Sequence, residues 1–349
     1  SKEYGLLNFG DWFGERGYNW GNIEYDTQHA LLVQYIRTGD RRFFAPAEWA
    51  VRHNMDVDTV HYHHQPFRVG AQYTHCMGHV GGYDWVGSTA IQQGGFSVSH
   101  SWVEGLLEYY CLTGDNCACE TAQLITDLYN TRDLTNYDFT NCRVPGWHLI
   151  MTMAMFNATN DRYYLNAAKI IVDRVLERQT PDQPLVENGR LNGGWTRLMI
   201  PGHCKCDPPR HIGNAGFMVG ILLAGLKAYH QVTGDELVKD SIIRAAYYLC
   251  RDVWEPEIVG FRYTSCPHSS KGTGNFRKLL GIAYAYRLTG NEDLGEVARK
   301  GVLAGIQNLS SSGKGLSAHS RFAPYVLHDL QIGDLEWRTN KWELRDLDY

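Results

Sequence analysis

The chain has 349 residues, of which 44% are hydrophobic, and its formal net charge is -5. This composition can bury one large core, and no linker or low-complexity tract divides the sequence, so we expect a single domain over residues 1–349. No apolar run approaches about 18 residues, which excludes a membrane-spanning helix, and the lack of a basic stripe argues against nucleic acid as a partner.

The most regular feature along the chain is the tripeptide Thr-Gly-Asp, or a near copy of it, which follows an apolar run five times. The copies begin at Thr38, Thr113, Thr159, Thr233 and Thr289. Gly or Asn supplies the left-handed residue that ends a helix, and Asp is a good N-cap for the next helix. Each copy therefore predicts a helical hairpin, with second helices such as 163–179 and 236–251.

The two helices of each predicted hairpin differ in polarity. The first is apolar nearly all round, as over 217–223 and 279–284, whereas the second carries charge on one face. A helix that is apolar all round is buried on both sides, and the irregular spacing of the copies does not suit an open solenoid. A degenerate sixth pair is expected around 316–330. The sequence therefore predicts an all-α fold, either a complete (α/α)6 toroid or an incomplete one of five to six hairpins.

The loops of such a toroid divide between its two rims. The Thr-Gly-Asp connections are short and lie at one rim, so the long returns over 53–99, 130–146, 180–213 and 252–274 emerge at the other. Long loops on a rigid scaffold commonly carry function. The inner helices also begin at that second rim, where their dipoles favour an anionic ligand.

Polar and aromatic residues gather in and around those returns. Before the first inner helix stand Trp20, Asn22, Tyr25, Asp26 and His29, and helix spacing would put the last four on one face. The first return is rich in histidine and in aromatic rings, which suit stacking on sugars or simple loop packing. The residues of the same kinds that precede later inner helices are Trp147, His148, Arg210, His211 and Asn214.

The nine cysteines include a close pair, Cys204 and Cys206, with His203 and His211 nearby as further candidate ligands. Thiolate and imidazole are the usual zinc ligands, although this spacing is tighter than the common C-x2-C pattern. Disulfides with Cys76, Cys142 or Cys266 are the competing interpretation. We expect no cofactor to be required for activity, and a structural zinc ion is the one candidate metal.

Several stretches of the chain form a recognisable pattern. They are Gly-Asp-Trp at 10–12, Asn-Trp-Gly-Asn at 19–22, Glu-Tyr-Asp-Thr-Gln-His at 24–29, Arg-His at 52–53 with Asp-Val-Asp-Thr-Val-His at 56–61, Gly-His-Val-Gly-Gly-Tyr at 78–83 and His-Ser-Trp-Val-Glu-Gly at 100–105. The pattern resembles the exo-acting rhamnogalacturonan lyase family, over most of the chain and most specifically over 19–105. The resemblance implies an (α/α) toroid catalytic domain that cleaves a uronate-containing polysaccharide by β-elimination.

β-Elimination removes the C5 proton of a uronate whose carboxylate has been neutralised, and an acid then protonates the leaving oxygen. We assign neutralisation or proton abstraction to His79 or His100, and proton transfer to Tyr83. The residues expected around the carboxylate are Asn22, Arg210 and His211, of which the last two are also assigned as catalytic. The residues expected to bind the sugars are Trp20, Tyr25, Trp85, Trp102, Trp147, His148 and Asn214.

A glycoside hydrolase of the unsaturated glucuronyl hydrolase type is the alternative, since Asp26, Asp84 and Glu104 offer carboxylates. It ranks second because histidine and tyrosine outnumber acids at the loop-bearing rim. A toroid that binds glycans without catalysis is the third interpretation. In each case we expect an acidic polysaccharide or oligosaccharide as the partner and a secreted or periplasmic location.

Overall fold

The structure is a computed structural model that describes residues 12–13, 20–21, 23–72, 96–179, 193–273, 275–310 and 313–332. Helices succeed one another in hairpins through this part of the chain. The pairs are α1 (Thr27–Thr38) with α2 (Arg41–His53), α4 (Glu104–Thr113) with α5 (Asn116–Arg132), α6 (Arg143–Thr159) with α7 (Arg162–Arg178), α8 (Gly216–Thr233) with α9 (Glu236–Asp252) and α10 (Phe276–Thr289) with α11 (Glu292–Gln307). A last helix, α12 (Gly313–Asp329), follows them.

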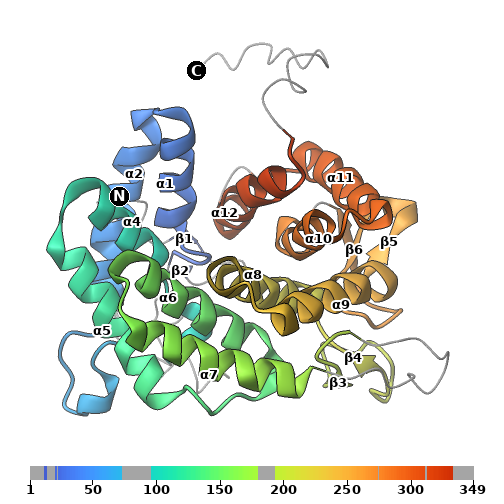
Figure 1. The fold of residues 1–349 in the computed structure, drawn as a ribbon, viewed down its shortest axis with the longest axis horizontal. Helices are drawn as coiled ribbons and strands as arrows, with labels where there is room; N and C mark the ends of the chain where they lie inside the picture. The colour runs from blue at the N-terminus through green and yellow to red at the C-terminus, as the bar shows by residue number, and fades with distance from the viewer. Residues whose placement is uncertain are drawn as a thin grey trace.

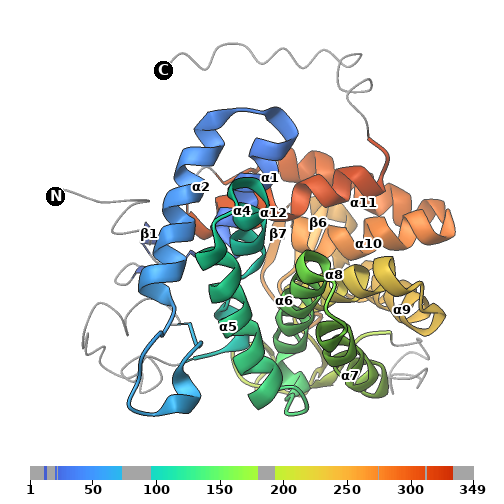
Figure 2. The same cartoon turned by 60° about the vertical axis from the view of Figure 1, so that its left-hand side comes forward.

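The first helix of each hairpin and α12 form a closed inner ring. Helix α1 contacts α4 and α12, α6 contacts α4 and α8, and α10 contacts α8 and α12. The partner helices α2, α5, α7, α9 and α11 lie outside this ring (Figures 1 and 2). The predicted all-α toroid is confirmed, and α12 supplies the inner helix of the expected sixth pair. Across the ranges given above, no helix is both long and apolar enough to cross a membrane.

The Thr-Gly-Asp connections are built as predicted. Each inner helix of a hairpin ends at a left-handed residue, as at Gly39 with φ 69°, and each outer helix begins at an Asp or Asn cap. In the first copy, Thr38 Oγ1 donates to the carbonyl of Gln34 at 2.7 Å, and the Asp40 N–H donates to Thr38 Oγ1 at 3.1 Å. The same two threonine bonds recur in the other four copies, so every position of the tripeptide serves the turn.

Burial follows the layers. The first eight residues of inner helix α8 are all buried, whereas outer helix α9 buries one face, at positions such as Val238, Ile242 and Ala245. Inner helices α6 and α8 approach closely at Gly146, where a Cβ would lie 2.7 Å from the Cα of Leu222. A glycine is therefore required at this contact.

Short elements occupy the returns from outer to inner helices. Strands β1 (Trp12–Phe13) and β2 (Trp20–Gly21) pair before α1, β3 (Arg197–Leu198) and β4 (Ile212–Gly213) pair before α8, and β5 (Trp254–Glu255), β6 (Gly260–Arg262) and β7 (Lys271–Thr273) form an antiparallel sheet before α10. The short helical segments are Asn54–Asp58, a π-helix, and Pro66–Arg68, Val98–His100, Phe139–Asn141 and Pro256–Ile258, all 3-10 turns. These returns place their residues at the rim where the inner helices begin.

Candidate active site

Four predicted site residues meet at the N-terminal ends of the inner helices. The ring of Tyr25 lies 6.3 Å from that of Trp102 and 5.9 Å from that of Trp147, and the two indoles meet edge to face at 4.8 Å. His100 lies edge-on to Trp102 at 6.4 Å. Together with Arg277, these residues are called the N-terminal mouth below. Trp102 and Trp147 are 2% and 3% exposed, so their rings are covered by protein and their role as sugar platforms stays a prediction.

Arg277 brings a cation to the mouth from the first turn of α10. Its Nη1 donates to the phenol oxygen of Tyr25, and its guanidinium carbon lies 4.8 Å from the centre of the Tyr25 ring. A charged donor at this oxygen stabilises negative charge there. The pair therefore offers a phenol suited to proton transfer beside a group that can receive a carboxylate.

The segment before α1 is not helical, so the predicted common face for Asn22, Tyr25, Asp26 and His29 is wrong. Ile23, Tyr25 and Asp26 have φ values of 33°, 70° and 58°. Helix α1 starts at Thr27 because Asp26 caps it and accepts from the His29 N–H at 3.3 Å. Left-handed residues other than glycine cost of order 1–3 kcal/mol and cluster at functional sites.

A chain of charged groups holds His100 in place. Its Nε2 lies 3.3 Å from Glu24 Oε1, and the other oxygen of Glu24 lies 3.1 Å from Nζ of Lys314. The Nδ1 of His100 lies 3.0 Å from Ser99 Oγ. Because both ring nitrogens have neighbours that orient them, His100 has the setting of a positioned acid or base.

A buried layer of charge lies beneath the mouth. Asp26 accepts from the backbone N–H of Glu104 at 3.1 Å and of Gly105 at 3.3 Å, so one carboxylate caps both α1 and α4. Arg321, on α12, contacts the Glu104 carboxylate and lies 3.7 Å from Asp26. Its guanidinium carbon is also 4.9 Å from the centre of the Trp147 ring. Arg321 thus lies against both carboxylates and against the Trp147 ring of the N-terminal mouth.

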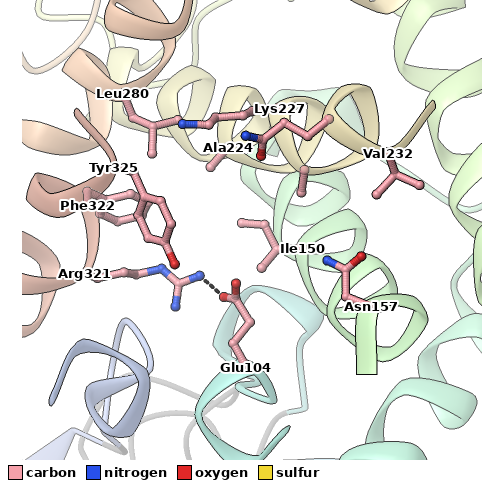
Figure 3. Close-up of a pocket in the computed structure, with 12 residues that line it drawn as sticks. Glu104, Ile150, Asn157, Ala224, Lys227, Val232, Leu280, Arg321, Phe322 and Tyr325 are labelled. Carbon is pink, nitrogen blue, oxygen red and sulfur yellow. Dashed lines mark hydrogen bonds and ion pairs between the residues drawn. The ribbon is translucent and has the colours of Figure 1, made fainter. Parts of the chain in front are cut away.

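A pocket of about 200 Å³ lies on the other side of this layer (Figure 3). Glu104, Arg321, Tyr325 and Lys227 give it a polar wall, and an adjoining pocket of about 350 Å³ adds Glu108. The remaining side chains that line the first pocket are Ile150, Asn157, Ala224, Ala228, Gln231, Val232, Leu280 and Phe322. Several of these belong to the last turns of α6 and α8, so this toroid pocket faces the Thr-Gly-Asp rim, where we had not expected a site.

Beside the toroid pocket, the buried side chain of His29 pairs with the partly exposed side chain of Glu108. His29 Nδ1 lies 2.8 Å from Glu108 Oε1. Burial, helped by Arg321 and opposed by Asp26, lowers the pKa of His29 to about 3. Burial, helped by Asp26, raises the pKa of Glu108 well above its usual value. The environment therefore favours a protonated carboxyl group next to a neutral imidazole.

Lys227 supplies the second cation of the toroid pocket. It forms an ion pair with Asp329, which also lies 3.3 Å from Arg287 Nη1. Its Nζ is 5.6 Å from the centre of the Tyr325 ring. Burial, together with Glu108 and against Arg321, raises the pKa of Tyr325 to about 12, so the tyrosine at this wall is a proton donor at neutral pH.

Two predicted sugar-binding residues have their polar atoms bonded to the protein. His148 is fully buried, with Nδ1 2.7 Å from Tyr137 OH and Nε2 2.8 Å from Asn130 Oδ1. Asn214 donates to the Trp195 carbonyl at 2.6 Å and accepts from the next backbone N–H at 2.8 Å. These contacts give both residues a structural role, and sugar binding by them stays a prediction.

The predicted carboxylate-binding pair, Arg210 and His211, lies in the β3–β4 loop. Arg210 is exposed, and His211 Nε2 is 3.2 Å from Ser265 Oγ. They accompany the cysteines of that loop and do not belong to the N-terminal mouth as defined above. Asn22, His79, Tyr83, Asp84 and Trp85 lie outside the described residues, and for Trp20 only the backbone in β2 is described, so the roles assigned to them stay predictions.

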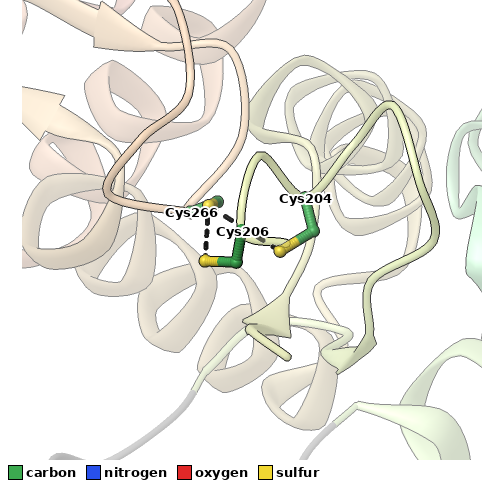
Figure 4. Close-up of side chains that lie close together, drawn as sticks. All are labelled: Cys204, Cys206 and Cys266. Atoms are coloured by element: carbon green, nitrogen blue, oxygen red, sulfur yellow. Dashed lines mark hydrogen bonds between the residues drawn. The ribbon is translucent and has the colours of Figure 1, made fainter. Parts of the chain in front are cut away.

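The predicted cysteine pair gains a third member. Sγ of Cys266, in the β6–β7 loop, lies 3.9 Å from Sγ of both Cys204 and Cys206 (Figure 4). His203 does not belong to this group, and its Nδ1 lies 3.3 Å from Arg197. Although burial opposes it, hydrogen bonds from backbone N–H groups lower the pKa of the Cys204 thiol to about 7.

Sequence reasoning missed several charged residues of the two sites. Arg277 and Arg321 lie on helices that the sequence marked only as ring elements, and Glu108 lies on the same face of α4 as Glu104. The available signal was position: Arg277 falls within the first turn of a predicted inner helix, where the other mouth residues cluster. Arg277 could therefore have been included among the candidate site residues.

Comparison with solved structures agrees with the fold. The chain is similar to a polysaccharide lyase (11% identity, TM-score 0.60, covering 90% of this chain and 91% of that one) and to unsaturated glucuronyl hydrolase from Bacillus sp. GL1 (12%, 0.55, 93% and 90%). It is also similar to cellobiose 2-epimerase from Spirochaeta thermophila (10%, 0.57, 89% and 86%). No family model matches the chain, and no curated protein matches its sequence. At these identities the likeness shows the (α/α) toroid fold, shared here by enzymes that act on carbohydrates.

Proposed function

We propose that this chain is an enzyme that cleaves a uronate-containing glycan by β-elimination at the N-terminal mouth. This proposal rests on the contact of Arg277 with the phenol oxygen of Tyr25, whose ring lies against Trp102, as does the ring of the positioned His100. The fold neighbours that act on carbohydrates support a glycan substrate. The sequence resemblance to exo-acting rhamnogalacturonan lyases favours the lyase reaction over the others found on this scaffold.

The residues of the mouth can be given roles in that reaction. Arg277 neutralises the uronate carboxylate, which makes the C5 proton more acidic, and the dipoles of the inner helices that begin at this rim add positive potential. His100, oriented by Glu24, accepts the C5 proton. Tyr25 donates its proton to the departing glycosidic oxygen, and Arg277 stabilises the phenolate that remains.

The first test is a screen of acidic polysaccharides for new ultraviolet absorbance, because β-elimination creates a C4–C5 double bond. Tyr25→Phe keeps the ring but removes the acid, so we expect turnover to fall by roughly 10²–10⁴. Tyr62→Phe is the matched control, since that tyrosine is 88% exposed. Equal rates in wild type and Tyr25→Phe, with helical content unchanged, would refute the role given to Tyr25.

A second candidate, a hydrolase of unsaturated uronyl sugars, is favoured by a different observation. Glu104 and Glu108 are four residues apart on α4, both line the adjoining pocket, and their environments differ. A protonated acid beside an ionised carboxylate is the arrangement of glycoside hydrolysis.

The two candidates predict opposite signals. A hydrolase would consume the absorbance of an unsaturated uronyl disaccharide, and Glu108→Gln would abolish that loss, whereas Glu236→Gln, on an exposed helix start, would not. A lyase would generate the absorbance and tolerate Glu108→Gln. A toroid that only binds glycans would do neither.

A further inference from the structure

Three cysteines from two separate loops converge at one point of the N-terminal rim. Cys204 and Cys206 belong to the loop between β3 and β4, and Cys266 belongs to the loop between β6 and β7, 62 residues beyond Cys204. The sulfur atoms of all three lie within 4.8 Å of one another. Figure 4 shows Cys266 facing both sulfurs of the other loop.

The separations of the sulfurs suit a shared metal ion. Two thiolates bound to one tetrahedral Zn²⁺ at about 2.3 Å stand about 3.8 Å apart. Cys266 Sγ lies 3.9 Å from Sγ of Cys204 and 3.9 Å from Sγ of Cys206. A disulfide would select one of these neighbours at about 2.05 Å and leave the third thiol alone. The sulfur of Cys266 is instead equidistant from both, as expected around a common centre.

We propose that Cys204, Cys206 and Cys266 bind a zinc ion through three thiolates, with water as the fourth ligand. Among the residues that the structure describes, no histidine, carboxylate or further cysteine joins these three as a fourth protein ligand. Cys206 is partly exposed, so solvent reaches the remaining position. This assignment replaces His203 of the sequence prediction with Cys266.

The surroundings suit the negative charge of such a centre. Lys205 and Arg210 add positive charge to the loop of Cys204 and Cys206. Three thiolates around one Zn²⁺ leave a net charge of about -1, which these groups offset.

The ion would hold the two loops together at the start of inner helix α8. The loops already touch, since Thr264 Oγ1 donates to the His203 carbonyl at 3.1 Å, and the Ser265 N–H donates to the Asn214 carbonyl at 3.0 Å. A metal cross-link between them constrains a long stretch of chain in the unfolded state. We therefore assign the zinc ion a structural role that does not depend on the reaction proposed above.

The test measures metal and thiols on the whole protein. Elemental analysis should find about one zinc per chain, and substitution with Co²⁺ should produce thiolate-to-metal charge-transfer absorption. A chelator should lower the melting temperature by several degrees and expose three further thiols to titration. Cys266→Ser should lose the zinc, and Cys206→His, which retains a ligand, should keep the metal with an altered Co²⁺ spectrum.

The control is Cys111→Ser, at an exposed cysteine on α4, which should retain zinc as the wild type does. Free thiols without metal would overturn the proposal. So would a disulfide among the three, seen as the loss of two hydrogens by mass, or Co²⁺ absorption that persists in Cys266→Ser. Because none of these measurements uses a glycan, their outcome is separate from the success or failure of the proposed lyase activity.

Discussion

Replacing Asp26 tests whether one buried carboxylate organises the start of two inner helices. Its oxygens accept from the backbone N–H groups of His29, Glu104 and Gly105, and Arg321 lies 3.7 Å away. Asp26→Ala would leave those three donors without their acceptor and would remove one of the two carboxylates around a buried guanidinium. Breaking a buried pair costs about 3–5 kcal/mol, and we expect the free energy of unfolding to fall by that amount.

The matched control is Asp115→Ala, which removes a cap of only one helix. Asp115 accepts from the Cys117 N–H at 3.1 Å and caps α5 at the opposite rim, so its loss should cost about 1 kcal/mol. Urea unfolding followed by circular dichroism compares the two variants under one protocol. If Asp26→Ala were no less stable than Asp115→Ala, the argument that Asp26 links α1, α4 and α12 would be wrong.

Three further outcomes follow from the structure. Burial lowers the pKa of His148 to about 3 from an ordinary 6.5, so its contribution to stability is present above pH 6.5 and is lost as the pH falls toward 3. Below pH 6.5 the wild type should lose up to about 1.4 kcal/mol per pH unit more than His148→Gln, and equal slopes would contradict this. Lys227→Met leaves Arg287 as the remaining arginine beside the buried Asp329 and should lower the free energy of unfolding by about 1–3 kcal/mol, whereas Lys169→Met, at an exposed pair on α7, should change it little; similar urea midpoints would argue against a buried pair. Gly146→Ala should cost about 1–3 kcal/mol because its Cβ would meet the backbone of α8, while Gly272→Ala, which has open space around it, should fold normally, and equal melting temperatures would show that the ring tolerates the extra methyl group.

The architecture could be predicted from the sequence because its signals are local. A left-handed Gly or Asn followed by an Asp or Asn cap needs only a few neighbouring residues, and each of the five copies predicted a turn that the structure contains. The all-round apolar first helices then implied an inner ring. The meeting of Tyr25, His100, Trp102 and Trp147 also followed in part, since helices of one ring all begin at the same rim.

Which residues make up the two sites depends on how the inner helices pack into a closed ring. The contacts of Arg277 with Tyr25, of Arg321 with Glu104 and of Cys266 with Cys204 join positions 252, 217 and 62 residues apart. No local pattern encodes such contacts, because they depend on which helices become neighbours and on how each is rotated about its axis. A buried cation on an apolar helix is tolerated only when tertiary packing brings a carboxylate, a phenol or an aromatic face to it. Tertiary structure likewise decided that Tyr25 and Asp26 leave the helical path, since the carboxylate of Asp26 has to reach the first turns of both α1 and α4.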